Sequence, residues 1–127
     1  MPKNADGPKG EVYAADFLAA KGYTITARNY RTRFGEIDLI AEQGGVLAFI
    51  EVKTRQEGAW GGPAAAVTRQ KQRRLILAAE GYLQEHPTEL QPRFDVVAIT
   101  TARGEDFRVL SCEHYEGAFE ASAANGF

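Results

Sequence analysis

Four charged side chains lie at alternate positions in two segments separated by a pair of glycines. Glu36 and Asp38 precede Gly44-Gly45, and Glu51 and Lys53 follow it. A Gly-Gly pair favours the two-residue loop of a β-hairpin. Counting outward from that loop places Asp38 opposite Glu51 and Glu36 opposite Lys53. Because side chains alternate across a strand, we expect all four charged groups on one face of the hairpin.

The apolar neighbours of these residues support the same register. Ile37, Leu39, Ile50 and Val52 occupy the intervening positions and are expected on the opposite face. A slip of one residue would mix the charged and apolar sets, which a hairpin with one buried face does not permit. The pattern therefore predicts a hairpin with one charged face and one core face.

The facing carboxylates of Asp38 and Glu51 predict a cation site. Opposed Cβ atoms in an antiparallel ladder are about 4.5–5.5 Å apart, so two carboxylates there repel unless a positive charge lies between them. A divalent cation such as Mg²⁺ prefers oxygen ligands and keeps several of its waters. With Lys53 beside it, the ion could activate water and stabilise the charge that develops during phosphodiester hydrolysis. We therefore predict Asp38 and Glu51 as ligands of Mg²⁺ or Mn²⁺ and as catalytic residues together with Lys53.

An ordinary ion pair is the alternative interpretation of the hairpin. Glu36 and Lys53 would then form a cross-strand salt bridge, with the other two acids on a solvated edge. Glu11 favours the metal site instead, because it shares a helical stripe with Ala14 and Leu18, where an apolar side chain is expected. We therefore add Glu11 to the predicted catalytic residues.

Two helices and five strands are predicted to position these residues. The first helix begins near Pro8, which suits a first helical turn, and ends before Gly22. Apolar runs predict strands over residues 23–29, 36–41, 46–54, 94–100 and 107–112. A second helix begins between Pro63 and Thr68 and is stopped by Pro87. The order α-β-β-β-α-β-β predicts an α/β fold with a central mixed sheet flanked by helices.

Two segments resemble the split active-site signature of the PD-(D/E)xK nuclease superfamily. They are Gly35-Glu-Ile-Asp-Leu-Ile40 and Phe49-Ile-Glu-Val-Lys-Thr-Arg55. Over residues 8–120 the chain resembles the YraN-like family of small bacterial proteins, and the superfamily is similar to restriction enzymes and archaeal Holliday-junction resolvases. Further matching positions are Gly10-Glu11, Arg28-Asn-Tyr-Arg31, Lys71 and Arg93-Phe-Asp-Val-Val97.

The resemblance implies a restriction-endonuclease-like α-β-β-β-α-β core that cleaves phosphodiesters with Mg²⁺. On the matched positions it implies Asp38 and Glu51 as metal ligands. It also implies Lys53 as the catalytic lysine and Glu11 as an acid near the metal. One departure is that Ile37 stands where the superfamily signature has proline.

The net charge of −2 conceals a segregation of charge along the chain. Residues 1–34 carry 6 basic and 3 acidic side chains, and residues 53–74 carry 6 basic and 1 acidic. These blocks flank the acidic hairpin, so both could hold a DNA backbone on either side of the site. A solvated surface is the alternative for each cation. The predicted nucleic-acid contacts, with Lys71 weighted by the resemblance, are Arg28, Arg31, Arg33, Arg55, Arg69, Lys71 and Arg74.

Length and composition set the outer limits of the interpretation. The chain has 127 residues, 44% of them hydrophobic and 25% charged, as in an average soluble domain. No apolar run is long enough to cross a bilayer. Residues 1–7 lack the apolar segment of a secretory signal, so we expect none. The single cysteine, Cys112, excludes an internal disulfide and a cysteine-based zinc site within one chain. We predict one cytoplasmic nuclease-like domain over residues 1–120, followed by a disordered tail at 121–127.

Three functions are compatible with these residues. The leading hypothesis is a metal-dependent endonuclease that acts on DNA, with branched or repair intermediates as candidate substrates. A second is a nucleic-acid-binding module that keeps the fold but does not cut. A third is a subunit whose partner completes the site, because cutting a junction needs two active sites and hence a homodimer.

Overall fold

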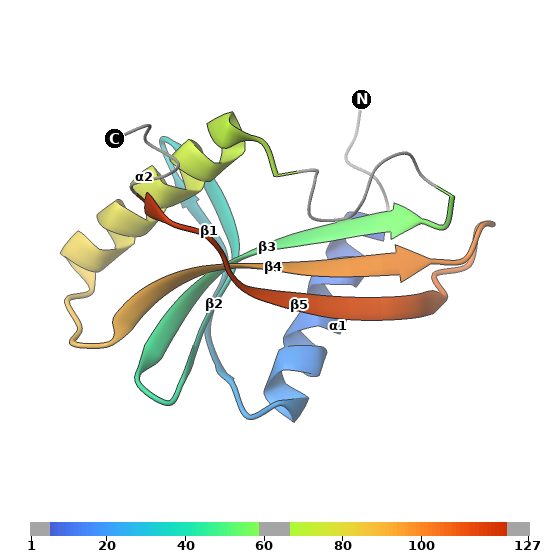
Figure 1. Cartoon of the computed structure of the whole chain (residues 1–127), viewed down its shortest axis with the longest axis horizontal. Coiled ribbons are helices and arrows are strands. Elements are labelled where there is room, and N and C mark those ends of the chain that lie inside the picture. Colours follow the sequence, from blue (N-terminus) through green and yellow to red (C-terminus); the bar gives the residue numbers. More distant parts are fainter. Residues whose placement is uncertain (1–5, 59–66, 122–127) are drawn as a thin grey trace.

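A computed structural model describes residues 6–58 and 67–121 of the chain (Figure 1). Among these residues, two helices and five strands follow one another in the predicted order. They are α1 (Asp6–Ala20), β1 (Thr24–Thr32), β2 (Gly35–Gln43), β3 (Val46–Gln56), α2 (Arg69–Glu85), β4 (Gln91–Thr101) and β5 (Val109–Phe119). The α-β-β-β-α-β order that the resemblance implies is confirmed, with β5 added at the end. Apart from Ala121, the tail predicted at 121–127 lies outside the described residues.

The strands form one mixed sheet in the order β1-β2-β3-β4-β5. Neighbouring strands are antiparallel except β3 and β4, which are parallel and are connected through α2. Figure 1 shows the sheet strongly twisted, with α1 against one face and α2 against the other. The predicted α/β fold, a central mixed sheet flanked by helices, is therefore confirmed.

Each helix covers its own hydrophobic cluster. Under α1, Leu18 packs in a cluster with Ile50 of β3, and under α2, Leu75 packs in a cluster with Phe49 of the same strand. Successive residues of β3 thus face opposite clusters, which explains the continuous apolar run at residues 46–50. Neither helix of the described chain is long and apolar enough to cross a membrane.

The turn between β2 and β3 sets the register that Gly44-Gly45 predicts. Both glycines have positive φ, 55° and 84°, which is the backbone that a tight two-residue hairpin loop requires. The ladder runs outward from the pair Gln43 and Val46 to the pair Leu39 and Ile50. This part of the predicted register is confirmed.

The ladder between β2 and β3 ends before the charged residues, which corrects two predicted pairs. Asp38 is not a ladder partner of Glu51. Glu36 is likewise not a ladder partner of Lys53. The backbone N–H of Val52 instead donates to the carboxylate of Asp38 at 2.8 Å, and the rest of β3 pairs only with β4. Because a side-chain oxygen has replaced a backbone carbonyl as acceptor, β2 leaves β3 at this point.

Ile37 lies on a different face from the one predicted. It packs in the α2 cluster, whereas Leu39 packs in the α1 cluster. The change of face occurs where Asn29 of β1, between the ladder pairs Arg28–Leu39 and Tyr30–Ile37, has a positive φ of 50°. A left-handed residue bends a strand locally, so the alternation of faces does not continue through this stretch.

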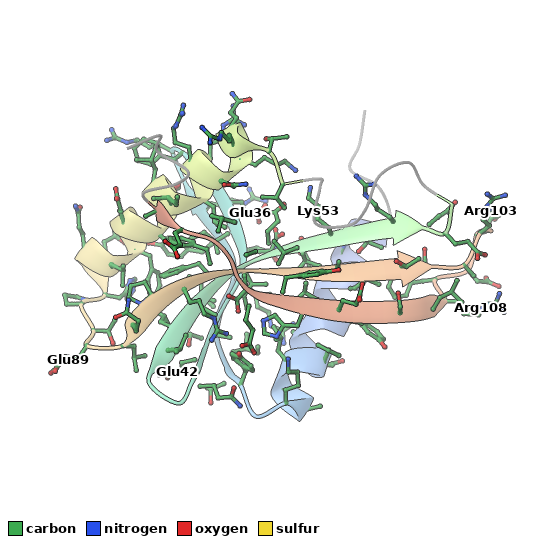
Figure 2. All side chains as sticks on the ribbon, in the orientation of Figure 1. Glu36, Glu42, Lys53, Glu89, Arg103 and Arg108 are labelled. Atoms are coloured by element: carbon green, nitrogen blue, oxygen red, sulfur yellow. The ribbon has the colours of Figure 1, made fainter. Side chains whose placement is uncertain are left out.

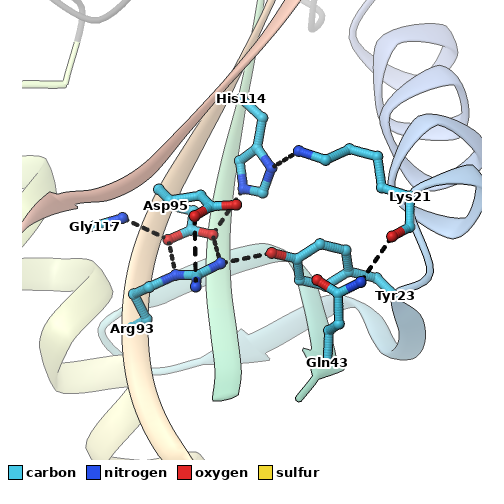
Figure 3. Close-up of polar contacts among 8 residues, drawn as sticks. Lys21, Tyr23, Gln43, Arg93, Asp95, His114 and Gly117 are labelled. Carbon is cyan, nitrogen blue, oxygen red and sulfur yellow. Dashed lines mark hydrogen bonds and ion pairs between the residues drawn. The ribbon is translucent and has the colours of Figure 1, made fainter. Parts of the chain in front are cut away.

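A polar cluster around the buried Asp95 joins the turn between α1 and β1 to strands β4 and β5 (Figure 3). Asp95 is fully buried. It accepts hydrogen bonds from Arg93 Nε at 2.9 Å, His114 Nε2 at 2.8 Å and the Gly117 backbone N–H at 2.9 Å. Lys21 Nζ lies 2.7 Å from the other ring nitrogen of His114. Burial raises the pKa of Asp95, but the hydrogen bonds from His114 and Arg93 outweigh it and hold the pKa below its ordinary value.

Candidate functional site

Two adjoining pockets share the side chains of Asp38, Glu51 and Lys71. The first, of about 230 Å³, is also lined by Glu36 and Arg74, and the second, of about 250 Å³, is also lined by Glu11 and Lys53. We call them together the acidic pocket, and Glu36 and Lys53 mark its position in Figure 2. Elements α1, β2, β3 and α2 each contribute to it, so the four predicted catalytic residues come together in the fold.

The surroundings of Asp38 strongly raise the pKa of its carboxyl group. Burial raises the pKa of Asp38 to about 7, and the neighbouring carboxylate of Glu51 adds to the rise. The hydrogen bond from the Val52 N–H lowers this pKa, and it holds the Asp38 side chain of β2 against β3. Near neutral pH this carboxyl group is therefore divided between its neutral and ionised forms, and a bound cation would favour the ionised one.

Glu51 lies between two lysines that come from different elements. Its Oε2 atom is 3.4 Å from Nζ of Lys53 on β3 and 3.7 Å from Nζ of Lys71 on α2. Contact with Lys53 and burial lower the pKa of Lys71, and Glu51 partly offsets this effect. The Lys53 side chain is 19% exposed and the Lys71 side chain 44%. Lys71 therefore belongs to the acidic pocket itself, and not only to the basic flank in which the sequence places it.

Close packing of α1 on β3 brings Glu11 to the acidic pocket. Gly10 is buried in α1, and a Cβ atom added there would meet the side chain of Thr54. Glycine in a helix interior costs about 1 kcal/mol relative to alanine. Steric exclusion by Thr54 explains why glycine nevertheless occupies this position. The close approach lets Glu11, the next residue, reach the wall of the pocket that contains Asp38.

Asn29 is a neighbour of the site that the sequence patterns did not reveal. Its amide Nδ2 donates to Oε1 of Glu11 at 2.8 Å, which links β1 to α1. Its positive φ of 50° is a conformation that asparagine adopts more readily than most residues. Two signals were available: an asparagine inside a predicted strand, where this residue type is depleted, and its place in the matching segment Arg28-Asn-Tyr-Arg31.

The predicted cationic contacts divide between the acidic pocket and its surroundings. Lys71 and Arg74 line the pocket with the acids. Near the end of β1, Nε of Arg31 is 3.9 Å from a carboxylate oxygen of Glu36, and Arg33 is exposed in the turn that follows. The others are Arg28, exposed in β1, Arg55, half buried in β3, and Arg69, exposed at the first residue of α2. Arg31 and Arg74 thus lie beside the acids of the pocket.

Two carboxylates form the donor set available for a metal. Over residues 6–58 and 67–121, no group of three or more His, Cys, Asp or Glu side chains is arranged to hold a metal ion. Mg²⁺ is nevertheless commonly held by one or two carboxylates while it keeps several waters. Asp38 and Glu51 offer oxygen donors of this kind, and their mutual repulsion contributes to the raised pKa of Asp38. The pair therefore fits a hard divalent cation.

Comparison with known proteins identifies the family. The sequence model of the uncharacterised protein family UPF0102 matches residues 10–99. A UPF0102 protein of Symbiobacterium thermophilum is 53% identical over 91% of this chain and 96% of its own length. Those of Anaeromyxobacter dehalogenans and Chlorobaculum parvum are 44% and 47% identical, over 98% and 89% of this chain and 90% of each relative. The chain therefore belongs to the uncharacterised protein family UPF0102, the YraN-like family that its motifs resemble.

Proposed function

We propose that this protein is a divalent-metal-dependent endonuclease that hydrolyses phosphodiester bonds in DNA. The observation that carries the proposal is the convergence of Asp38 and Glu51 with Lys53 and Lys71 in one pocket. Carboxylates that bind a cation and amines that bind a phosphate are the two components that metal-assisted phosphodiester hydrolysis needs. The acidic pocket places both within a few ångströms of each other.

Asp38 and Glu51 would hold Mg²⁺ or Mn²⁺. The bound ion supplies a positive charge that lowers the pKa of a water and stabilises negative charge on phosphate oxygens. The protein's own contribution is to orient the two acids. The Val52 N–H orients Asp38, and the ammonium groups of Lys53 and Lys71 lie within 4 Å of the Glu51 carboxylate.

We assign Lys53 to the reacting phosphate. It is the more buried of the two lysines, so water screens its charge less and its effect on a developing oxyanion is larger. Lys71 adds a second positive charge from α2. Glu11, fixed by its hydrogen bond from Asn29, offers a carboxylate that can accept a proton or a hydrogen bond from water.

Cations around the acidic pocket would bind the DNA backbone. The acids themselves repel phosphate, so attraction has to come from the basic residues that flank them. We propose this role for Arg28, Arg31, Arg33, Arg55, Arg69, Lys71 and Arg74. Binding through such contacts weakens steeply as the salt concentration rises.

A nuclease assay tests the proposal. Single-stranded, duplex, flapped and four-way DNA are each incubated with the protein in Mg²⁺, in Mn²⁺ and in EDTA. We expect cleavage only with a divalent metal, and a loss of about a hundredfold or more in Asp38→Asn and Lys53→Ala. Glu89→Gln is the matched control, because Glu89 is exposed and lies far from Glu36 and Lys53 in Figure 2. Cleavage that persists unchanged in both site variants would contradict the assignment.

Two further outcomes of this assay are informative. Binding without cleavage on every substrate would instead identify a nucleic-acid-binding module that keeps this fold. Paired cuts across a four-way junction need two active sites, so we propose that a homodimer forms on such DNA, which light scattering would measure. We further propose a cytoplasmic location, in keeping with a single cysteine, Cys112.

A further inference from the structure

A separate pocket, of about 640 Å³, lies between the β1–β2 turn and the C-terminal half of α2. We call it the turn groove. Its lining includes Arg31 from the end of β1, Arg33 and Phe34 from the turn, and Gly81 and Gln84 from α2. The proposed hydrolysis gives no role to Phe34, Gly81 or Gln84, so the groove needs its own explanation.

The turn groove adjoins the acidic pocket. Arg31 pairs with Glu36 across the ladder between β1 and β2, and Glu36 lines the acidic pocket. On α2, Arg74 lines the acidic pocket and Gly81 lines the turn groove. These two positions lie about 10 Å apart along the helix axis, a length that a DNA strand covers in a few nucleotides.

A fixed platform of one cation and one aromatic ring forms the turn wall of the groove. The guanidinium of Arg33 lies over the ring of Phe34, 4.8 Å from its centroid. The Thr32 hydroxyl holds this turn, because it accepts the backbone N–H of Phe34 at 3.0 Å and donates to the carbonyl of Gly35 at 2.9 Å. Unpaired bases stack on aromatic rings and on guanidinium planes of this kind.

Gly81 keeps the opposite wall of the groove open. It lies inside α2, where glycine costs about 1 kcal/mol relative to alanine, yet a Cβ atom placed there would meet nothing within 4 Å. Internal packing therefore does not require glycine at this position, and a larger side chain there would extend into open space beside the groove. On the same wall, Gln84 and Glu85 offer polar atoms to the edge of a base, and Glu85 is held by the Tyr30 hydroxyl at 2.9 Å.

We propose that the turn groove binds an unpaired nucleotide of the DNA substrate, an inference that rests on the proposed nuclease function. The base stacks on Arg33 and Phe34. Arg31, which is exposed and only loosely paired with Glu36, contacts a neighbouring phosphate. A continuous duplex has to unstack a base to fill the groove, which costs energy. The favoured substrates are therefore DNAs with a single-stranded segment close to the scissile bond, such as flaps and forks.

Binding measured in EDTA tests the turn groove without requiring cleavage. Fluorescence anisotropy gives the Kd for a flapped duplex and for a continuous duplex of the same length. A 2-aminopurine base in the flap reports stacking by the quenching of its fluorescence. We expect the wild type to bind the flapped DNA about fivefold or more tightly than the duplex, and to quench the probe.

Two variants remove the features that carry the inference. Phe34→Leu removes the ring but keeps an apolar side chain, and Gly81→Leu fills the groove with a good helix former. Each should reduce the preference for flapped DNA to about twofold or less and abolish the quenching. Arg108→Ala is the control, because Arg108 is exposed and lies far from Glu36 and Lys53 in Figure 2. Thermal melting checks that each variant is folded. If Phe34→Leu does not fold, the binding and quenching of Gly81→Leu decide whether the groove binds the nucleotide.

The outcomes separate this inference from the proposed nuclease function. A preference for flapped DNA that survives both substitutions would overturn the groove assignment. A wild type that cleaves DNA but binds flapped and continuous duplexes equally would also overturn it, while leaving the nuclease function intact. Flap preference and quenching without cleavage in any metal would overturn the nuclease function and leave the groove assignment in place.

Discussion

The carboxylate of Asp38 accepts the backbone N–H of Val52 at 2.8 Å, where a backbone pair between β2 and β3 would otherwise continue. Asp38→Ala would leave this N–H without its acceptor, so any loss of activity would combine a structural effect with a chemical one. Asparagine keeps an oxygen acceptor and removes only the charge. Asp38→Asn is therefore the informative substitution at this position.

The stability of the metal-free protein should fall as the pH rises through neutrality. The pKa of Asp38 is about 7 in the fold, against an ordinary value of 3.8. Between these values the folded protein binds a proton that the unfolded chain has released. The free energy of unfolding in EDTA should therefore decrease from about pH 4 to above pH 7, by on the order of a few kcal/mol.

Asp38→Asn isolates this contribution, because the variant lacks the titrating group and keeps all the others. Its unfolding free energy should exceed that of the wild type at about pH 8, and the two should converge at about pH 4. Urea titrations of both proteins across this range measure the difference. Parallel profiles for the two proteins would contradict the raised pKa.

Removal of Lys53 should cost more activity than removal of Lys71. The Lys53 side chain is 19% exposed and that of Lys71 is 44%, so solvent screens the second charge more. We expect Lys53→Ala to lower kcat/KM by about 100- to 1000-fold, and Lys71→Ala by about tenfold. Single-turnover cleavage at saturating Mg²⁺ measures both, with Arg108→Ala as the control for loss of a positive charge. A larger loss in Lys71→Ala would show that the roles of the two lysines are reversed.

Asn29→Gly should impair the use of metal without weakening the fold. Glycine keeps the positive φ of this position and removes the amide that donates to Glu11. We expect an unchanged Tm and about a tenfold rise in the Mg²⁺ concentration that gives half-maximal cleavage. Asn29→Ala should in addition lose about 1–2 kcal/mol of stability, because alanine is strained at positive φ. A Mg²⁺ dependence that Asn29→Gly leaves unchanged would limit Asn29 to a structural role.

Gly10→Ala should destabilise the protein although alanine is the better helix former. The new Cβ atom would meet the side chain of Thr54, and overpacking of this kind costs about 1–3 kcal/mol. Thr54→Ala in the same chain should restore much of the lost Tm. Thr54→Val is the matched control, because valine keeps the bulk of threonine and should give no rescue. Equal melting of the two double variants would show that the clash is not the cause.

Asp95→Asn should lower stability by about 3–5 kcal/mol at neutral pH. The substitution removes the negative charge that Arg93 and His114 contact inside the fold (Figure 3). The pKa of Asp95 lies below its ordinary value. Its contribution is therefore fully present above about pH 4 and is lost as the pH falls through the lowered pKa. Chemical denaturation at about pH 7 and about pH 3 should show a smaller deficit at the acid end. A deficit independent of pH would point to lost shape complementarity.

Local patterns predicted the hairpin only as far as its local interactions extend. The Gly-Gly turn and the alternation of side chains predict the register correctly up to Leu39 and Ile50. The prediction failed immediately beyond, where the side chain of Asp38 takes the N–H of Val52. No periodicity in a sequence signals that a side chain will replace a backbone acceptor. The misplacement of Ile37 has a separate cause, the left-handed Asn29 in the neighbouring strand, which the alternation of residue types does not reveal either.

The acidic residues of the candidate site could be predicted from the sequence more fully than the residues that surround them. Asp38 and Glu51 belong to one hairpin, so local spacing indicates that they lie close together. Asn29 and Lys71 reach the site through the packing of β1 and α2, which depends on contacts between distant parts of the chain. The length of β5 was underestimated for a similar reason, because its continuation past a left-handed Gly117 depends on a bond to Asp95.

The pairing of β3 has a consequence for synthesis on the ribosome. β3 is paired along its whole length with β4, from Val46 and Gln91 to Gln56 and Thr101, and β2 has already left it at Ile50. A nascent chain that ends before β4 therefore has no partner strand for the segment with Glu51 and Lys53. Such a fragment presents an unpaired strand edge, which is open to pairing with other chains and to proteolysis. Incomplete chains thus lack an assembled acidic pocket, and its appearance is tied to completion of the polypeptide.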